Sequence, residues 1–202
     1  ERQLLARVAS QTQRHWDERL PGSLRGWRLL LVGAGDIASA VAQVFSSLGV
    51  QVFGVASQAR QQASFVQVVA LPQLVEQAAQ ADYVVNLLPD TPATTDLFDA
   101  RLFARLKPSA LFINAGRGAA VVDADLFAAL EHGQLAGAVL DVCRQEPLPA
   151  SHPFWSAPRL LLTAHSAAPT LPAPMVQLFL RNLQAYRRGL PLQGEVLFSR
   201  GY

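Results

Sequence analysis

Short apolar runs alternate with amphipathic segments along most of this chain, and this alternation restricts the fold more than any other feature. Several runs are apolar at consecutive positions, as in Tyr83-Val-Val-Asn-Leu-Leu88. Strands with apolar side chains on both faces are expected in a parallel sheet that helices cover on both sides. Strands that alternate with helices through right-handed crossovers predict an α/β fold with a doubly wound parallel sheet.

The positions of the runs predict the individual elements. The expected strands are Arg28–Val32, Gln51–Val55, Val66–Val69, Tyr83–Leu87, Ala110–Asn114, Gly137–Asp141 and Leu160–Thr163. The expected helices are Asp36–Leu48, Pro72–Gln80, Ala100–Leu106, Asp123–His132 and Pro174–Arg188. A further amphipathic helix is expected over Glu1–Leu20, with Leu4, Leu5, Val8, Thr12, His15, Trp16 and Leu20 near one face.

These elements divide the chain into three parts. We expect an interdomain or dimerisation helix over residues 1–20, a dinucleotide-binding domain over 21–168, and a C-terminal helix and tail over 169–202. The 202 residues suffice for one domain with a sizeable core, or for one domain and a fragment of another. Because the first segment already resembles the middle of a protein, we expect part of a substrate domain to be missing.

Composition narrows the class of protein. Half of the residues are apolar and 16% are charged, which is typical of a folded domain. The apolar runs are too short to cross a bilayer, and the formal charge is only +2 with scattered arginines, so neither a membrane nor a nucleic acid is expected as a partner. The single cysteine, Cys143, excludes an intramolecular disulfide, fits a reducing compartment such as the cytoplasm, and is interpreted as a packed thiol.

The segment Gly33-Ala-Gly-Asp-Ile-Ala38 directly follows the first expected strand and opens a helix. Gly33 permits a tight turn, and Gly35 lets the backbone approach a pyrophosphate at the helix N-terminus, beside Asp36 and Ile37. Ala38 is tolerated at the third position, which governs only the packing of helix against strand. The pattern predicts a Rossmann-type dinucleotide-binding domain.

The end of the second strand distinguishes the two nicotinamide cofactors. An acidic residue there would hold the ribose hydroxyls and repel a 2′-phosphate, but Ala56 stands about where that acid would fall. Ser57 and Gln58 can donate hydrogen bonds, and Arg60 adds a cation that suits a phosphate. An ordinary loop arginine is the alternative interpretation of Arg60. The sequence favours NADP, with NAD possible.

Three ionisable side chains lie where expected strands end: Arg117, Glu146 and His165. An arginine fork binds a planar carboxylate, and a histidine beside a carboxylate can serve as a proton donor. Each also has a structural interpretation, as a loop arginine, a solvent-facing glutamate or a local backbone cap. His132, before Gly133, is interpreted as a helix-end charge, His15 and His152 lack supporting context, and no metal site is expected.

Several motifs occur in the order seen in one family: Asn114-Ala-Gly-Arg-Gly118, Leu140-Asp-Val142, Glu146-Pro-Leu-Pro149, Phe154-Trp155 and Thr163-Ala-His165. From about Trp27 to Tyr202 the chain resembles the D-isomer-specific 2-hydroxyacid dehydrogenases. Leu88-Pro-Asp-Thr-Pro-Ala-Thr94 is similar to the nicotinamide-side loop of that family. The closing Arg200-Gly-Tyr202 resembles the C-terminus of its glyoxylate/hydroxypyruvate reductase branch.

The resemblance implies a role for each matching residue. Arg117 would anchor the substrate carboxylate, His165 would protonate the keto oxygen, and Glu146 would hold the other imidazole nitrogen and favour its protonated form. Asp141 would face the nicotinamide carboxamide. The remaining expected cofactor contacts are Leu88, Pro89, Thr94 and Ala115, together with Arg117 and His165 themselves.

The chain also departs from the family pattern. The family usually has proline before the catalytic histidine, where this chain has Ala164. Its reductase branch often carries an arginine after a threonine, where this chain has Thr170-Leu171, so a more apolar 2-oxo acid becomes plausible. Relatives add a first domain that closes over the cofactor, and we expect weak or no turnover from this chain without it.

The leading hypothesis is therefore a reductase that converts a small 2-oxo acid, such as glyoxylate or hydroxypyruvate, to the D-2-hydroxy acid. A dinucleotide-sensing, corepressor-like regulator is the alternative, because relatives of that kind keep the same Arg, Glu and His. Another Rossmann enzyme, such as an alanine dehydrogenase, is disfavoured by the ordered trio. The family commonly pairs its cofactor domains, so a homodimer is expected.

Overall fold

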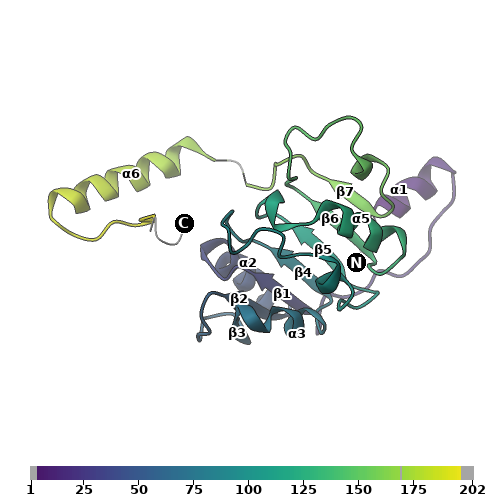
Figure 1. Ribbon diagram of the computed structural model, residues 1–202, viewed down its shortest axis with the longest axis horizontal. Helices are drawn as coiled ribbons and strands as arrows, with labels where there is room; N and C mark the ends of the chain where they lie inside the picture. Colours follow the sequence, from purple (N-terminus) through teal and green to yellow (C-terminus); the bar gives the residue numbers. More distant parts are fainter. Residues whose placement is uncertain (1–3, 169, 197–202) are drawn as a thin grey trace.

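A computed structural model describes residues 4–168 and 170–196, and it contains one seven-stranded sheet (Figure 1). The strand order is β3-β2-β1-β4-β5-β6-β7, and every neighbouring pair is parallel. The strands are β1 (Arg28–Val32), β2 (Gln51–Ala56), β3 (Gln67–Ala70), β4 (Tyr83–Asn86), β5 (Leu111–Asn114), β6 (Gly137–Leu140) and β7 (Leu160–Leu162). The predicted doubly wound parallel sheet is confirmed.

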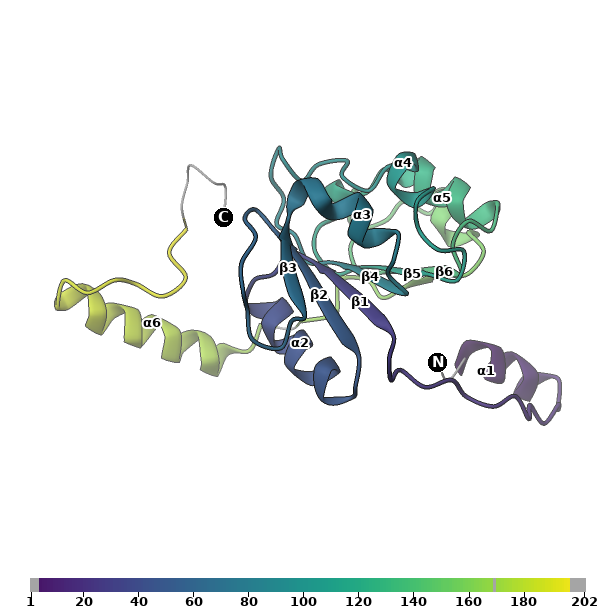
Figure 2. The same cartoon turned by 90° about the horizontal axis from the view of Figure 1, so that it is seen from below.

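Helices cover both faces of the sheet, with α2 on one side and α3, α4 and α5 on the other (Figure 2). Side chains of β1 show why: Leu29 and Leu31 pack into the core beneath α2, whereas Leu30 and Val32 pack into the larger core of the opposite face. Alternation along one strand thus buries both of its faces. The α-helices are α1 (Leu4–Thr12), α2 (Asp36–Ser47), α3 (Leu74–Ala78), α4 (Ala100–Phe103), α5 (Asp123–Glu131) and α6 (Pro172–Arg187), and the 3₁₀ turns are Leu71–Gln73, Gly118–Ala120 and Pro153–Trp155.

The prediction of a single long helix over Glu1–Leu20 is wrong. Within the described residues α1 ends at Thr12, and the chain turns at Arg14, whose φ is +56°. The guanidinium of Arg7 then donates to the carbonyl of Asp17, 2.8 Å away, which holds the following segment folded back on the helix. The apolar periodicity continues through this turn, although the helix does not.

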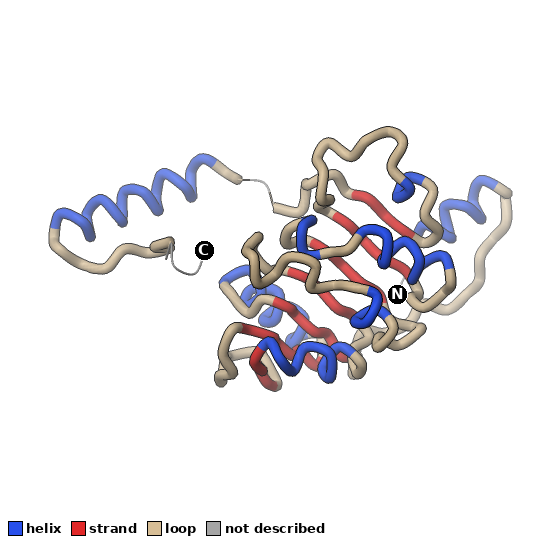
Figure 3. Tube along the Cα trace, in the orientation of Figure 1, coloured by secondary structure: helices blue, strands red, loops and turns tan. Residues whose placement is uncertain are grey.

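The terminal helices α1 and α6 lie away from the sheet, on opposite sides of the molecule (Figures 1 and 3). Their apolar side chains are exposed, including Val8 on α1 and Phe179 on α6. Helix α6 begins at Pro172, two residues before the predicted start, because proline is well accommodated in the first turn of a helix. These two helices add little to the core described above.

Strand register brings the predicted site residues to one edge of the sheet. Asn86 pairs with Val32 on one side and with Asn114 on the other, and Asn114 pairs in turn with Leu140. The segments that follow these four positions therefore begin side by side at the carboxyl ends of the strands, where open α/β sheets bind ligands.

Candidate active site

The glycine-rich turn after β1 forms one wall of a cleft. Gly33 has φ +105°, and a Cβ there would lie 2.9 Å from the carbonyl carbon of Leu87. Gly35 is the N-cap residue of α2, and a Cβ on it would meet nothing within 4 Å. Gly33 thus permits close packing of two loops, while Gly35 leaves open space above the start of the helix.

That open space suits a pyrophosphate. No described side chain caps α2, so the first backbone N–H groups of the helix are available to donate hydrogen bonds to an anion. The cleft has a volume of about 490 Å³. Its walls include nine of the predicted cofactor contacts: Gly33, Gly35, Ile37, Ser57, Arg60, Leu88, Pro89, Ala115 and Arg117.

Arg60 lies at the rim of this cleft and is tied to the glycine-rich turn. Its Nη2 donates to the carbonyl of Ala34 at 2.5 Å, and its Nε donates to Oε1 of Gln62 at 2.9 Å. Gln62 also reaches α2, where Nε2 donates to Oγ of Ser39 at 2.9 Å. Sequence reasoning identified Arg60 but missed Gln62, because no motif marks a glutamine two residues beyond an arginine.

Two buried asparagines organise the centre of the strand edge. Nδ2 of Asn86 donates to Oδ1 of Asn114 at 2.9 Å, and both side chains are fully buried. Asn86 also accepts from the backbone N–H of Leu88, and Asn114 from that of Gly116. The pair therefore fixes the two loops that carry the predicted nicotinamide-side contacts. The sequence signal that could have identified this pair is the asparagine at the end of each of two apolar strands.

The loop of Arg117 packs tightly against the loop that follows β6. A Cβ on Gly118 would lie 2.0 Å from the carbonyl carbon of Cys143, so only glycine fits. Arg144 strengthens this contact, since its Nη2 donates to the carbonyls of Ala119 and Val121 and pairs with Asp96. Arg117 itself is exposed, with Nη1 bonded to the carbonyl of Gly116 at 2.8 Å.

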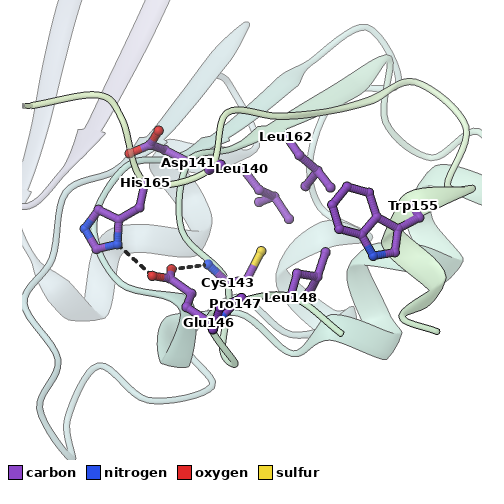
Figure 4. A pocket seen from close by; sticks show the side chains of 10 residues that line it. Leu140, Asp141, Cys143, Glu146, Pro147, Leu148, Trp155, Leu162 and His165 are labelled. Atoms are coloured by element: carbon purple, nitrogen blue, oxygen red, sulfur yellow. Dashed lines mark hydrogen bonds and ion pairs between the residues drawn. The ribbon is translucent and has the colours of Figure 1, made fainter. Parts of the chain in front are cut away.

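His165 and Glu146 form a direct pair (Figure 4). Nδ1 of His165 lies 2.7 Å from Oε2 of Glu146, and the other carboxylate oxygen accepts from the backbone N–H of Cys143 at 2.8 Å. The hydrogen bond from His165, helped by that of Cys143, lowers the pKa of Glu146 although partial burial opposes it. The ionised form of the glutamate is therefore favoured beside the imidazole.

Asp141 anchors the turn that carries His165. Burial of its carboxyl acts to raise the pKa, but hydrogen bonds from Oγ1 of Thr163 and from the N–H groups of Ser166 and Ala167 outweigh it, so the pKa is lowered. The carbonyl of Asp141 also accepts from the N–H of His165 at 2.5 Å. A contact between Asp141 and a nicotinamide stays a prediction.

The turn before His165 has a backbone conformation that does not accept the proline expected from the family pattern. Ala164 has φ +51° and His165 has φ +54°. The ring of a proline fixes φ near −65°, so proline cannot adopt the conformation that Ala164 has here. Two successive non-glycine residues at positive φ store strain, which the hydrogen bonds to Asp141 hold in place.

One cavity brings the three predicted catalytic residues together. Arg117, Glu146 and His165 line a space of about 230 Å³, together with Asp90 and Arg144. Because Arg117 also lines the cofactor cleft, the two spaces adjoin at this arginine. The cavity offers a cation for a carboxylate and an imidazole for proton transfer, next to the proposed cofactor position.

A second, mostly apolar cavity of about 490 Å³ lies on the Glu146 side of the imidazole (Figure 4). Its walls include Leu148, Trp155 and Leu162, and Nε1 of Trp155 donates to the carbonyl of Pro149 at 2.8 Å. Cys143 contributes its sulfur to the same wall. Burial raises the pKa of that thiol to about 11, which agrees with the predicted packed thiol and not with a nucleophile.

Several predicted residues lie outside the cleft. Asp36 and Gln58 are exposed and are not part of its walls. Thr94 is buried and uses its hydroxyl within its own loop, donating to the carbonyl of Pro89 at 2.7 Å. The motif Arg200-Gly-Tyr202 lies outside the described residues.

His132 and His152 lie at the ends of helical segments, away from the cleft. His132 is the C-cap residue of α5. Nδ1 of His152 accepts from the N–H of Phe154, and Nε2 lies 3.4 Å from Oδ2 of Asp123, a structural role that sequence analysis missed.

Within residues 4–168 and 170–196, no group of three His, Cys, Asp or Glu side chains is arranged to hold a metal. No helix in the same ranges has the length and apolar character that crossing a membrane requires.

Comparisons with known proteins agree with this geometry. Residues 1–167 match the family model described as D-isomer specific 2-hydroxyacid dehydrogenase, NAD binding domain. Glyoxylate/hydroxypyruvate reductase A of Serratia proteamaculans is 38% identical over 195 residues, which cover 95% of this chain and 61% of the relative. The enzyme of the same name from Yersinia enterocolitica is 36% identical over 202 residues, with the same coverage.

Solved structures show the same fold. A D-isomer specific 2-hydroxyacid dehydrogenase family protein from Aeromonas salmonicida superposes with a TM-score of 0.90 at 42% identity, covering 98% of this chain and 64% of that one. An NADPH-dependent glyoxylate/hydroxypyruvate reductase from Sinorhizobium meliloti, in complex with NADP and sulfate, gives a TM-score of 0.90 at 30% identity, covering 100% and 65%. This chain thus spans less than two thirds of the length of these relatives.

Proposed function

Because the chain belongs to the D-isomer specific 2-hydroxyacid dehydrogenase family, we propose that it forms the cofactor-binding part of an NADPH-dependent 2-oxo acid reductase. Its substrate would be a small acid of the glyoxylate or hydroxypyruvate kind, reduced to the D-2-hydroxy acid. The observation that carries the proposal is the cavity beside the cofactor cleft that Arg117 lines together with the paired His165 and Glu146.

The chemistry follows from what each side chain can do. The guanidinium of Arg117 would bind the planar carboxylate of the substrate and place positive charge near the keto oxygen, where negative charge develops. Nε2 of His165 would donate the proton to that oxygen, while Glu146 holds Nδ1 and fixes the ring. A bound nicotinamide would supply the hydride. The loops fixed by Asn86 and Asn114 would keep it beside the substrate.

The cofactor preference rests on the rim of the cleft. Ala56, Ser57 and Arg60 line it, and none of the acidic residues that the structure describes is part of its walls, so a ribose 2′-phosphate would meet a cation and a hydroxyl. The relative from Sinorhizobium meliloti is NADPH-dependent and binds NADP, which supports the same preference here. NAD would bind less tightly, because it lacks the phosphate that Arg60 recognises.

The substrate class has separate support. The named relatives are reductases of glyoxylate and hydroxypyruvate, which favours an enzyme over the dinucleotide-sensing regulator. Leu171, where the reductase branch often has an arginine, is 59% exposed and offers no charge to a second polar group. Acids with a small or apolar substituent on the keto carbon are therefore the best fit.

We also propose that the protein is a cytoplasmic homodimer. Leu4, Trp16 and Leu20 are exposed on a segment that lies away from the sheet, and a second copy would cover them. The free thiol of Cys143 suits a reducing compartment. Light scattering of the full-length protein should give the mass of two subunits, and a stable monomer would overturn the dimer.

The reductase proposal is tested by NADPH and NADH oxidation with glyoxylate, hydroxypyruvate, pyruvate and phenylpyruvate. The full-length protein should reduce at least one of these acids, with NADPH preferred, whereas this chain by itself should bind NADPH but turn over slowly. If the full-length protein reduces none of them, the proposal fails. Equal or better use of NADH would overturn the cofactor preference alone.

A further inference from the structure

We propose that Gln62 is a positioning residue for cofactor selection, because it orients the guanidinium of Arg60 toward the 2′-phosphate of NADPH. The inference rests on the proposed function in one respect, namely that Arg60 recognises that phosphate. It adds a residue that reaches the phosphate only through Arg60 and that fits none of the family motifs.

The orientation of the Gln62 amide is fixed by its surroundings. Oγ of Ser39 donates its single hydrogen to the carbonyl of Gly35 at 2.8 Å, so it must accept from Gln62. Nε2 of Gln62 is therefore the atom 2.9 Å from Ser39, and it also donates to the carbonyl of Ala34 at 3.3 Å. The amide oxygen must then face Nε of Arg60, as it does at 2.9 Å.

The same contacts occupy one edge of the Arg60 guanidinium and leave the other available. Nε bonds to Gln62 and Nη2 bonds to the carbonyl of Ala34, so protein oxygens take the edge that these two nitrogens form. Among the described residues no acceptor bonds to Nη1, and no carboxylate pairs with Arg60. The edge formed by Nη1 and Nη2 keeps the parallel donors that bind a phosphate through two oxygens.

The backbone of Arg60 is held as well. Its N–H donates to the carbonyl of Val68 at 3.1 Å, which fixes where the side chain starts, while Gln62 and Ala34 fix where it ends. Arginine otherwise loses considerable rotamer freedom when it binds a ligand. Gln62 lowers that cost before the cofactor arrives, and the gain applies only to a ligand that carries the 2′-phosphate.

Substitutions at two adjacent glutamines separate this role from general loop stability. Gln62→Leu removes the contact, and Gln62→Glu places a carboxylate beside Arg60 that competes with the phosphate. Gln61→Leu and Gln61→Glu make the same changes on the exposed neighbour, for which no bond to Arg60 is found within the described chain. Calorimetry measures binding of 2′,5′-ADP and of 5′-AMP, which differ only in the phosphate at issue.

We expect Gln62→Leu to weaken 2′,5′-ADP about fivefold to tenfold, and Gln62→Glu to weaken it more, with 5′-AMP changed less than about twofold. The two Gln61 variants should bind both ligands as the wild type does. Equal weakening of both ligands, or no change in either, would overturn the role of Gln62. If the wild type itself does not prefer 2′,5′-ADP, the proposed NADPH preference fails instead. If both Gln62 variants keep the wild-type preference for 2′,5′-ADP over 5′-AMP, the role of Gln62 is refuted and the NADPH preference stands.

Discussion

Glu146 holds His165 by one ring nitrogen and leaves the other for chemistry. Oε2 of Glu146 lies 2.7 Å from Nδ1 of His165, while Oε1 is fixed by the backbone N–H of Cys143. No described residue bonds to Nε2 of His165, whose ring is half exposed at the boundary of two cavities. The pair has the arrangement of an oriented proton donor.

Replacement of His165 by glutamine should remove proton donation from the full-length protein. We expect kcat/KM for the preferred 2-oxo acid to fall about 10²-fold to 10⁴-fold, while the dissociation constant of NADPH stays the same. Steady-state kinetics and fluorescence titration measure the two quantities. Glu146→Gln should lower the rate less, and the double variant should be no slower than His165→Gln, because the pair acts as one unit. Retained activity in His165→Gln would show that another group donates the proton.

Acid should weaken the anchor at Asp141. Its pKa is lower in the folded chain than the ordinary value of 3.8, because hydrogen bonds outweigh burial, so the unfolded chain binds its proton first as the pH falls. The stability that Asp141 contributes is complete above that ordinary value and is lost as the pH falls below it toward the folded pKa. Asp141→Asn should therefore be less stable than wild type at pH 7, by about 1–3 kcal/mol, with a smaller difference in acid.

Urea unfolding at a series of pH values, with both proteins in the same buffers, measures this difference. A gap between wild type and Asp141→Asn that does not change with pH would show that the carboxylate charge is not what stabilises the turn.

The buried amide pair should be sensitive to removal of either member. Asn114→Leu leaves Nδ2 of Asn86, the N–H of Gly116 and the carbonyl of Arg117 without their partner. We expect a loss of about 2–4 kcal/mol in the free energy of unfolding, since buried polar groups without partners are costly. The control is Asn182→Leu, because Asn182 bonds to Gln193 at an exposed site on α6. Similar losses at both sites would contradict the role given to burial.

A proline at position 164 should disturb the turn before His165. Its fixed φ is incompatible with the +51° of Ala164, so Ala164→Pro should lower the free energy of unfolding by more than about 1 kcal/mol. Ala164→Gly accepts positive φ and should change stability much less. Thermal or urea unfolding compares the two variants. A proline variant as stable as wild type would show that the turn can adopt the other conformation without cost.

Much of the fold could be predicted because its signals are local. The seven strands are runs of apolar residues, and Gly33 and Gly35 stand in a turn whose chemistry is specific, so the sheet and the cleft followed from short segments. The prediction of one helix over residues 1–20 was wrong because the spacing of apolar residues carries no information on the turn at Arg14. That turn is accompanied by a contact between Arg7 and Asp17, which the sequence pattern does not reveal.

The missed site residues depend on contacts between distant segments. Asn86 matters because Asn114, 28 residues later, lies opposite it in the sheet, and Gln62 matters because it reaches Ser39 on α2. Neither partner is visible until strand order and register are known. Arg117, Glu146 and His165 were found because each occurs within its own recognisable motif.

The contact between Gly118 and Cys143 limits how this site can change over time. Any side chain at position 118 would collide with the backbone of the neighbouring loop, so only glycine lets the arginine loop pack this closely against the loop that carries Glu146. If Arg117 binds the acid and His165 donates the proton, this packing would keep the distance between them nearly the same from one acid to the next. New substrate preferences would then arise from substitutions in the cavity walls around these two loops. The two packed loops themselves should tolerate few substitutions.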